Sequence, residues 1–236
     1  MLRSIDYYTK KIDVDPGAGN MINKIIIADD HPLFRSALTS GVSMEFEGCN
    51  VIEASSCGTL QDRVSEHSDC DLILLDLCIP GVHGFSGLIF LRAQFPDIPV
   101  VIISGTEDVD TVRKAIDFGA AGFIPKSSSL LEIVSAIKMV MDGGLYLPQD
   151  MVEDVKKAKP EKDEFAMCIS NLTPKQFTVL NYMAEGMLNK QIAAEIKVSE
   201  ATVKAHVTAI LNKLHVSSRT QAVIALKGMD IGEITA

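Results

Sequence analysis

Short apolar runs rich in β-branched residues alternate with longer segments of helical periodicity through residues 22–145 of this 236-residue chain. The runs predict five strands, at residues 24–28, 50–54, 71–75, 100–103 and 122–124. Between them apolar residues recur every three or four positions, the spacing of amphipathic helices. Strands that are apolar throughout are typical of a parallel sheet covered by helices on both faces. The pattern therefore predicts a doubly wound five-stranded α/β domain over residues 22–145.

Proline, glycine and charged residues divide the rest of the chain into an N-terminal extension, a linker and a second domain. Residues 1–21 contain Pro16 and two glycines without clean periodicity, so we expect a flexible extension. Charged residues and Pro160 predict a linker over residues 146–170. Residues 171–236 show only helical periodicity and fit four short helices, which predicts a second, all-α domain.

Composition narrows the class of protein. Apolar residues make up 47% and charged residues 22%, which excludes a disordered chain. No apolar run approaches the ~20 residues of a membrane span, and residues 1–20 lack the apolar core of a secretory signal. Five cysteines form no CxxC pair, which argues against a disulfide framework or a zinc site. We therefore expect a cytoplasmic protein without a membrane partner.

The charge is unevenly distributed between the two predicted domains. The net charge is −9, but residues 170–236 carry seven basic and five acidic side chains, a net +2. The preceding residues therefore carry −11. Such a split is typical of an acidic module tethered to one that approaches a polyanion.

Polar residues follow four of the predicted strands, where an open parallel sheet gathers its functional groups. These residues are Asp29, Asp30, Asp76, Ser104 and Lys126. Carboxylates brought to one crevice repel each other, and Mg²⁺ is a hard cation suited to relieve this repulsion. A carboxylate beside the metal can accept a phosphoryl group, with a hydroxyl and an ammonium to hold its oxygens. The alternative is that the acids merely cap the following helices, as Asp30 before His31-Pro32 would do.

Four motifs resemble the receiver domain of two-component response regulators: DDHPLFR at 29–35, LLDLCIPGVHG at 74–84, IISG at 102–105 and GAAGFIPK at 119–126. The resemblance implies a flavodoxin-like fold with Asp76 as phosphoacceptor. It implies that Asp29, Asp30, Asp76 and the backbone carbonyl of Cys78 hold Mg²⁺. It also implies that Lys126 and Ser104 hold the phosphoryl group and that the aromatic Phe123 reorients with Ser104.

The segment 189–214 has the pattern of a helix, a tight turn and a second helix. Val203, Val207 and Ile210 form the apolar face of the second helix, which leaves Lys204 and Thr208 on the opposite face. We expect Ser199 to cap this helix. An exposed polar face is usually only solvated, but the short turn and the local positive charge favour entry into a DNA major groove.

The same segment resembles the LuxR-type helix-turn-helix, through NKQIA at 189–193 and TVKAHV at 202–207. The resemblance implies that Lys204, Ala205 and Thr208 face the bases. It implies that four further residues lie near phosphates: Lys190, Thr202, His206 and Lys213. Ala222, Val223 and Leu226 either pair two such domains or close the four-helix core.

The two modules in this order are typical of a response regulator of the NarL/FixJ type. We expect a sensor histidine kinase to phosphorylate Asp76, and the protein to bind double-stranded promoter DNA as a homodimer. We expect no enzymatic activity beyond the acceptance and loss of its own phosphoryl group. One alternative is a phosphorylation-independent regulator whose receiver is a dimerisation scaffold. A small phosphatase with Asp76 as nucleophile would leave residues 172–228 unexplained.

Overall fold

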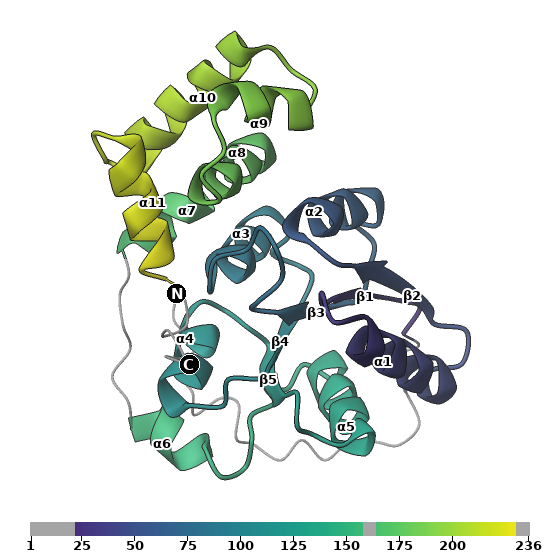
Figure 1. Ribbon diagram of the computed structural model, residues 1–236. Helices are drawn as coiled ribbons and strands as arrows, with labels where there is room; N and C mark the ends of the chain where they lie inside the picture. The colour runs from purple at the N-terminus through teal and green to yellow at the C-terminus, as the bar shows by residue number, and fades with distance from the viewer. Residues whose placement is uncertain (1–21, 158–163, 230–236) are drawn as a thin grey trace.

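A central parallel sheet organises the first domain of the computed structural model, which describes residues 22–157 and 164–229 (Figure 1). Its strands are β1 (Lys24–Ala28), β2 (Asn50–Ala54), β3 (Leu72–Asp76), β4 (Val100–Ser104) and β5 (Gly122–Pro125). They pair in parallel in the order β2-β1-β3-β4-β5. The predicted five-stranded, doubly wound fold is confirmed, and all five strands lie within one residue of the predicted ranges. Residues 1–21, predicted as an extension, lie outside the described residues.

Helices cover both faces of the sheet. One face packs against α1 (Pro32–Glu45) and α5 (Leu130–Met141), whose buried residues join a core that includes Ile25, Ile27 and Ile103. The other face packs against α2 (Cys57–Glu66), α3 (Ser86–Gln94) and α4 (Val109–Asp117). Local sequence sets the helix starts, because Ser56, Asp108 and Ser129 each accept a hydrogen bond from a backbone amide of the first turn.

The predicted linker contains two short helices that its charged composition did not predict. Tyr146 first forms an isolated parallel bridge with Gly122 of β5, and its carbonyl accepts from the Phe123 amide at 2.9 Å. Helix α6 (Val152–Lys157) then contacts α4 and buries Val155. Helix α7 (Glu164–Ser170) packs against α3. The parts of this stretch that the structure describes therefore lie on the first domain rather than forming an open tether.

The second domain consists of α8 (Pro174–Ala184), α9 (Asn189–Glu195), α10 (Glu200–Lys213) and α11 (Arg219–Lys227). The four predicted helices are thus present within the described residues. Lys197, in the turn between α9 and α10, has a φ of 55°, the left-handed conformation that usually favours glycine. Ala222 and Leu226 of α11 are fully buried, so these two residues close the helical core.

The two domains share a continuous apolar core. The cluster that lies between the sheet and α2, α3 and α4 extends without a break to Phe177, Leu180 and Ile210 of the second domain. In Figure 1, α7 and α8 lie between the receiver-like domain and the pair α9 and α10. No described helix is long and apolar enough to cross a membrane.

Candidate functional site

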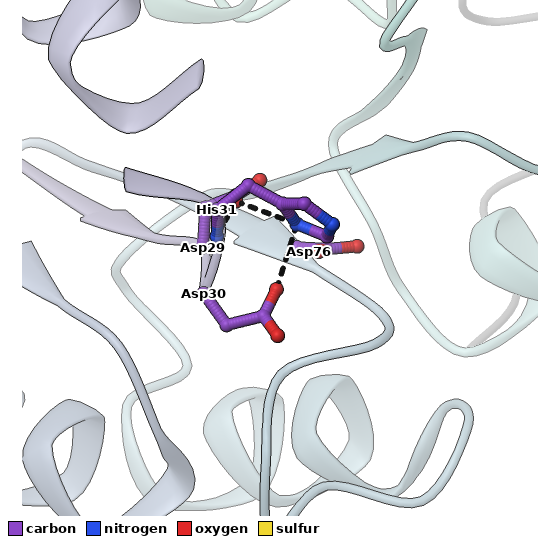
Figure 2. A group of neighbouring side chains, drawn as sticks. All are labelled: Asp29, Asp30, His31 and Asp76. Atoms are coloured by element: carbon purple, nitrogen blue, oxygen red, sulfur yellow. Dashed lines mark hydrogen bonds and ion pairs between the residues drawn. The ribbon is translucent and has the colours of Figure 1, made fainter. Parts of the chain in front are cut away.

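Three carboxylates converge at the carboxyl edge of the sheet, as the positions of the strand ends predicted. Asp29 and Asp30 follow β1, and Asp76 ends the neighbouring strand β3 (Figure 2). One ligand atom from each of these residues and from His31 lies within 4.8 Å of the others. Asp29 and Asp76 are both 2% exposed, so their charges are withdrawn from water. This arrangement requires positive charge for its stability.

Lys126, directly after β5, supplies that charge in the described structure. Its ammonium lies 2.7 Å from Asp29 Oδ2 and 2.7 Å from Asp76 Oδ2. Burial disfavours the ammonium form, but the hydrogen bonds and charges of the two carboxylates outweigh it and raise the pKa of Lys126. Burial raises the pKa of Asp76, and Lys126 offsets this only in part. Lys126 thus holds the buried carboxylates together.

Backbone amides orient the same carboxylates. The His31 amide donates to Asp29 Oδ1 at 2.7 Å, and the Cys78 amide donates to Asp76 Oδ1 at 3.1 Å. The N-cap of α1 is His31, and no side chain caps that helix, so the capping alternative is wrong for Asp30. The backbone amides of His31 and Cys78 thus fix the positions of the Asp29 and Asp76 carboxylates in the pocket.

The surroundings of Asp30 Oδ1 indicate whether the pocket suits a cation. Asp30 Oδ1 is buried and receives no hydrogen bond from any described residue, although the His31 ring lies 2.8 Å away. A buried carboxylate oxygen with only a histidine ring beside it is costly unless a cation also binds it. The oxygen-rich set of Asp29, Asp30 and Asp76 matches the preference of Mg²⁺. These residues therefore fit a magnesium ion.

Ser104 and Phe123 lie on β4 and β5, beside the carboxylates, and both side chains are fully buried. The Ser104 hydroxyl accepts a hydrogen bond from the Thr106 amide at 3.1 Å. Phe123 packs in the apolar core on the α4 side of the sheet. Cys78 is exposed in the loop after β3. The roles of Ser104 and Phe123, and of the Cys78 carbonyl as a metal ligand, stay predictions.

The second candidate site is the outer face of α10. Ser199 caps this helix as predicted, accepting from the Thr202 amide at 3.0 Å. Thr202, Lys204, Ala205 and Thr208 are exposed, and Lys190 is exposed on α9, whereas His206 is half-buried. The Lys204 ammonium lies 3.0 Å from Glu200 Oε1, one turn earlier. The helix thus presents small and basic residues to solvent and is held by its buried apolar face.

Lys213 has a structural partner that the sequence did not predict. Its ammonium donates to the Asn171 carbonyl and to Gln176 Oε1, both at 2.8 Å. Gln176 is also the N3 residue of the capping box that begins α8 with Thr173. Arg219 likewise donates to the Met187 carbonyl at 2.5 Å and so ties α11 to the α8–α9 loop. Spacing along one helix could not identify either cation as a tie between helices.

Comparisons with known proteins agree with this geometry. The family model of the response regulator receiver domain matches residues 25–138, and that of the luxR family of bacterial regulatory proteins matches residues 170–226. The chain is 44% identical over 212 residues to the glycerol metabolism activator of Pseudomonas putida, covering 88% of this chain and 96% of that protein. It is 32% identical over 203 residues to the virulence transcription regulator BvgA of Bordetella pertussis, covering 86% and 96%.

Solved structures show the same fold. RcsB of Salmonella typhimurium aligns over 89% of this chain and 98% of that one, with a TM-score of 0.54 and 22% identity. An RcsB–DNA complex aligns over 86% and 96%, with a TM-score of 0.52 and 21% identity. A parallel receiver sheet with an acidic pocket, followed by a helix-turn-helix, defines a two-domain signalling regulator of transcription. The chain belongs to the NarL/FixJ-type response regulators of two-component systems.

Proposed function

We propose that Asp76 is the phosphoacceptor and that its phosphorylation controls DNA binding by the second domain. The supporting observation is the pocket in which Asp29, Asp76 and Lys126 meet. We assign residues 22–145 to the receiver, 146–170 to the linker and 171–236 to the DNA-binding effector. A sensor histidine kinase is the proposed donor. Because the target is promoter DNA, the protein works in the compartment that holds DNA, the cytoplasm.

In the proposed reaction an Oδ atom of Asp76 attacks the phosphorus of a phosphohistidine. A phosphorus–oxygen bond forms as the phosphorus–nitrogen bond breaks, and the imidazole leaves with the electron pair. Lys126 moves from the carboxylate to the new phosphoryl oxygens, and Ser104 donates a hydrogen bond to them. Asp29, Asp30, Asp76 and the Cys78 carbonyl would hold Mg²⁺, which would supply positive charge beside these oxygens. The chain accepts and loses this group without turning over another substrate.

On the effector side, α10 enters the major groove. Lys204, Ala205 and Thr208 contact bases, and Lys190, Thr202, His206 and Lys213 lie near phosphates. The supporting observation is the exposure of the first three side chains on one helix face. A homodimer places two such helices about one DNA turn, ~34 Å, apart. The alignment with the relative named as a transcription regulator covers 86% of this chain and 96% of that protein, so it includes both domains.

The test is the intact mass of the full chain after incubation with Mg²⁺ and acetyl phosphate. We expect one phosphoryl adduct in the wild type and in Asp110→Asn, which alters an exposed acid of α4. We expect none in Asp76→Asn or after chelation of the metal. Calorimetric titration of Asp30→Asn with Mg²⁺ should show weaker binding. An unmodified wild type would instead favour the phosphorylation-independent scaffold.

A further inference from the structure

The side chain of His31 lies at the acidic pocket but has no part in the proposed phosphoryl transfer. His31 follows Asp29 and Asp30 directly and is the N-cap of α1, yet its side chain makes no capping hydrogen bond. Histidine is not among the residues favoured at an N-cap, and Pro32 begins the helix without an amide to be capped. The start of α1 therefore does not explain the position of the ring.

The ring nitrogen Nδ1 of His31 lies as close to the carboxylates as one metal ligand lies to the next. It is 2.8 Å from Asp30 Oδ1 and 3.3 Å from Asp29 Oδ1 (Figure 2). Two adjacent ligands of one ion are about 3.0 Å apart when each bond to the metal is about 2.1 Å. Asp76 offers a further oxygen, and the four ligand atoms lie within 4.8 Å of one another. His31 thus adds one nitrogen to a closely grouped set of three oxygens.

The lone pair of Nδ1 faces these oxygens. Lys126 Nζ lies 3.4 Å from Nδ1, and an ammonium can donate a hydrogen bond but cannot accept one. Nδ1 is therefore the acceptor in this contact and carries no proton. Asp30 Oδ1 is buried and receives no hydrogen bond from any described residue, so its 2.8 Å contact with Nδ1 is not a hydrogen bond either. Two acceptor atoms at this distance repel each other unless a cation binds both.

The charges of the pocket also call for a divalent ion. Three carboxylates bring three negative charges, and the Lys126 ammonium offsets one of them. The ammonium contacts Asp29 and Asp76 through their Oδ2 atoms, at 2.7 Å each. The side of the pocket beside His31 instead offers Oδ1 of Asp29 and Oδ1 of Asp30. A divalent ion bound on that side balances the two remaining charges.

A nitrogen ligand changes which divalent ion the pocket favours. Mg²⁺ prefers oxygen ligands and gives up its bound water reluctantly. Imidazole suits first-row transition ions, whose affinity for a given site rises from Mn²⁺ through Co²⁺ to Ni²⁺. The three carboxylates together with His31 therefore suit a transition ion better than the carboxylates alone would.

We propose that His31 Nδ1 joins Asp29 and Asp30 as a metal ligand and makes the pocket selective for first-row transition ions over Mg²⁺. Both kinds of ion use the carboxylates of Asp29 and Asp30, so they bind in competition. The pocket then responds to the supply of transition metal as well as to a phosphodonor. This inference rests on the proposed function only for the metal site that the two share, and it does not require phosphorylation of Asp76.

The test titrates Co²⁺ and Mg²⁺ separately into the untagged full chain and measures each dissociation constant by calorimetry. The reference protein carries Cys78→Ser, which removes an exposed thiol near Asp76 and keeps the backbone carbonyl. His31→Asn, made in the reference protein, replaces the nitrogen ligand with an oxygen. Asparagine is favoured at helix N-caps, so this variant should keep α1. His67→Asn is the matched control, because His67 lies at the end of α2.

We expect the ratio of the Mg²⁺ to the Co²⁺ dissociation constant to fall about tenfold in His31→Asn and to stay the same in His67→Asn. Proton NMR reports the ligand directly, because bound Co²⁺ shifts the ring protons of a coordinated histidine far outside their usual range. We expect such signals in the reference protein and in His67→Asn, and none in His31→Asn. An unchanged ratio in His31→Asn would overturn the proposal, because the ring would then only position Asp30.

Intact mass after incubation with Mg²⁺ and acetyl phosphate reports the proposed function in the same proteins. Phosphorylation of the reference protein without shifted histidine signals would refute the histidine ligand and leave the proposed function standing. Shifted histidine signals in a reference protein that accepts no phosphoryl group would support the ligand and count against the proposed function. The two measurements therefore fail independently of each other.

Discussion

The ammonium of Lys213 has two competing assignments, a phosphate contact and a tie between α10 and the start of α8. The variant Lys213→Met keeps the aliphatic stem but removes two hydrogen bonds of 2.8 Å, to the Asn171 carbonyl and to Gln176 Oε1. Hydrogen bonds to charged groups contribute ~1.5–3 kcal/mol each. Lys213 is half-buried, so water can hydrogen-bond to part of the groups that lose the ammonium. We therefore expect the free energy of unfolding to fall by roughly 1–3 kcal/mol in total.

For a domain of this size the melting temperature should fall by about 4–8 °C per kcal/mol, measured by circular dichroism at 222 nm. The control is Lys190→Met, which removes an exposed charge from α9 and should leave the melting temperature unchanged. The salt dependence of DNA binding separates the roles, since loss of one phosphate contact lowers the slope by about one. An unchanged melting temperature for Lys213→Met, together with a lower slope, would refute the structural role.

Three further predictions concern the turn between α9 and α10, the outer face of α10 and the contact between the two domains at Cys57. Lys197→Gly should stabilise the effector by up to ~1 kcal/mol in thermal unfolding, because glycine adopts a φ of 55° without strain; a lower melting temperature would contradict this. Lys204→Ala should cost roughly 1–3 kcal/mol of specific DNA binding in fluorescence anisotropy. Glu200→Gln, which frees Lys204, should strengthen binding instead, and equal affinity in both variants would contradict a DNA contact. Cys57 has a pKa of about 12 when docked and 9.0 ordinarily, so the native protein retains a proton that the unfolded chain loses. Stability should therefore fall as pH rises from 9 towards 12, with a smaller fall in Cys57→Val; identical denaturant midpoints across this range would exclude the effect.

The sequence predicted what local pattern and strand order determine. The apolar run at residues 24–28 could only be a buried strand in this context, and parallel strand ends necessarily bring Asp29 and Asp76 to one edge. The position of Ser199 directly before an amphipathic helix also predicted that it caps α10. These features depend on residues close in sequence or on the general geometry of an open sheet.

The sequence did not predict which surfaces of different elements meet. Phe90 and Phe177 both have the pattern of ordinary core residues, and nothing in either helix indicates that they stack on each other. Asn181 resembles a solvated residue in the pattern of α8 but is buried against Cys57. The charged composition of residues 150–164 concealed α6, and α7 was too short to be recognised at the end of the predicted linker, because short helices gain their stability from packing rather than from propensity.

The core that runs from the sheet into α8 limits how freely these two domains can be exchanged in evolution or in engineering. Each domain completes the interior of the other, because one buried apolar cluster includes residues of both. An effector transplanted from a relative must bring an aromatic ring for Phe90 and a small polar group for Cys57. A chimera matched only at the linker would leave Phe90 and Cys57 without these partners. An exchange of domains must therefore preserve the matched surfaces of α3 and α8.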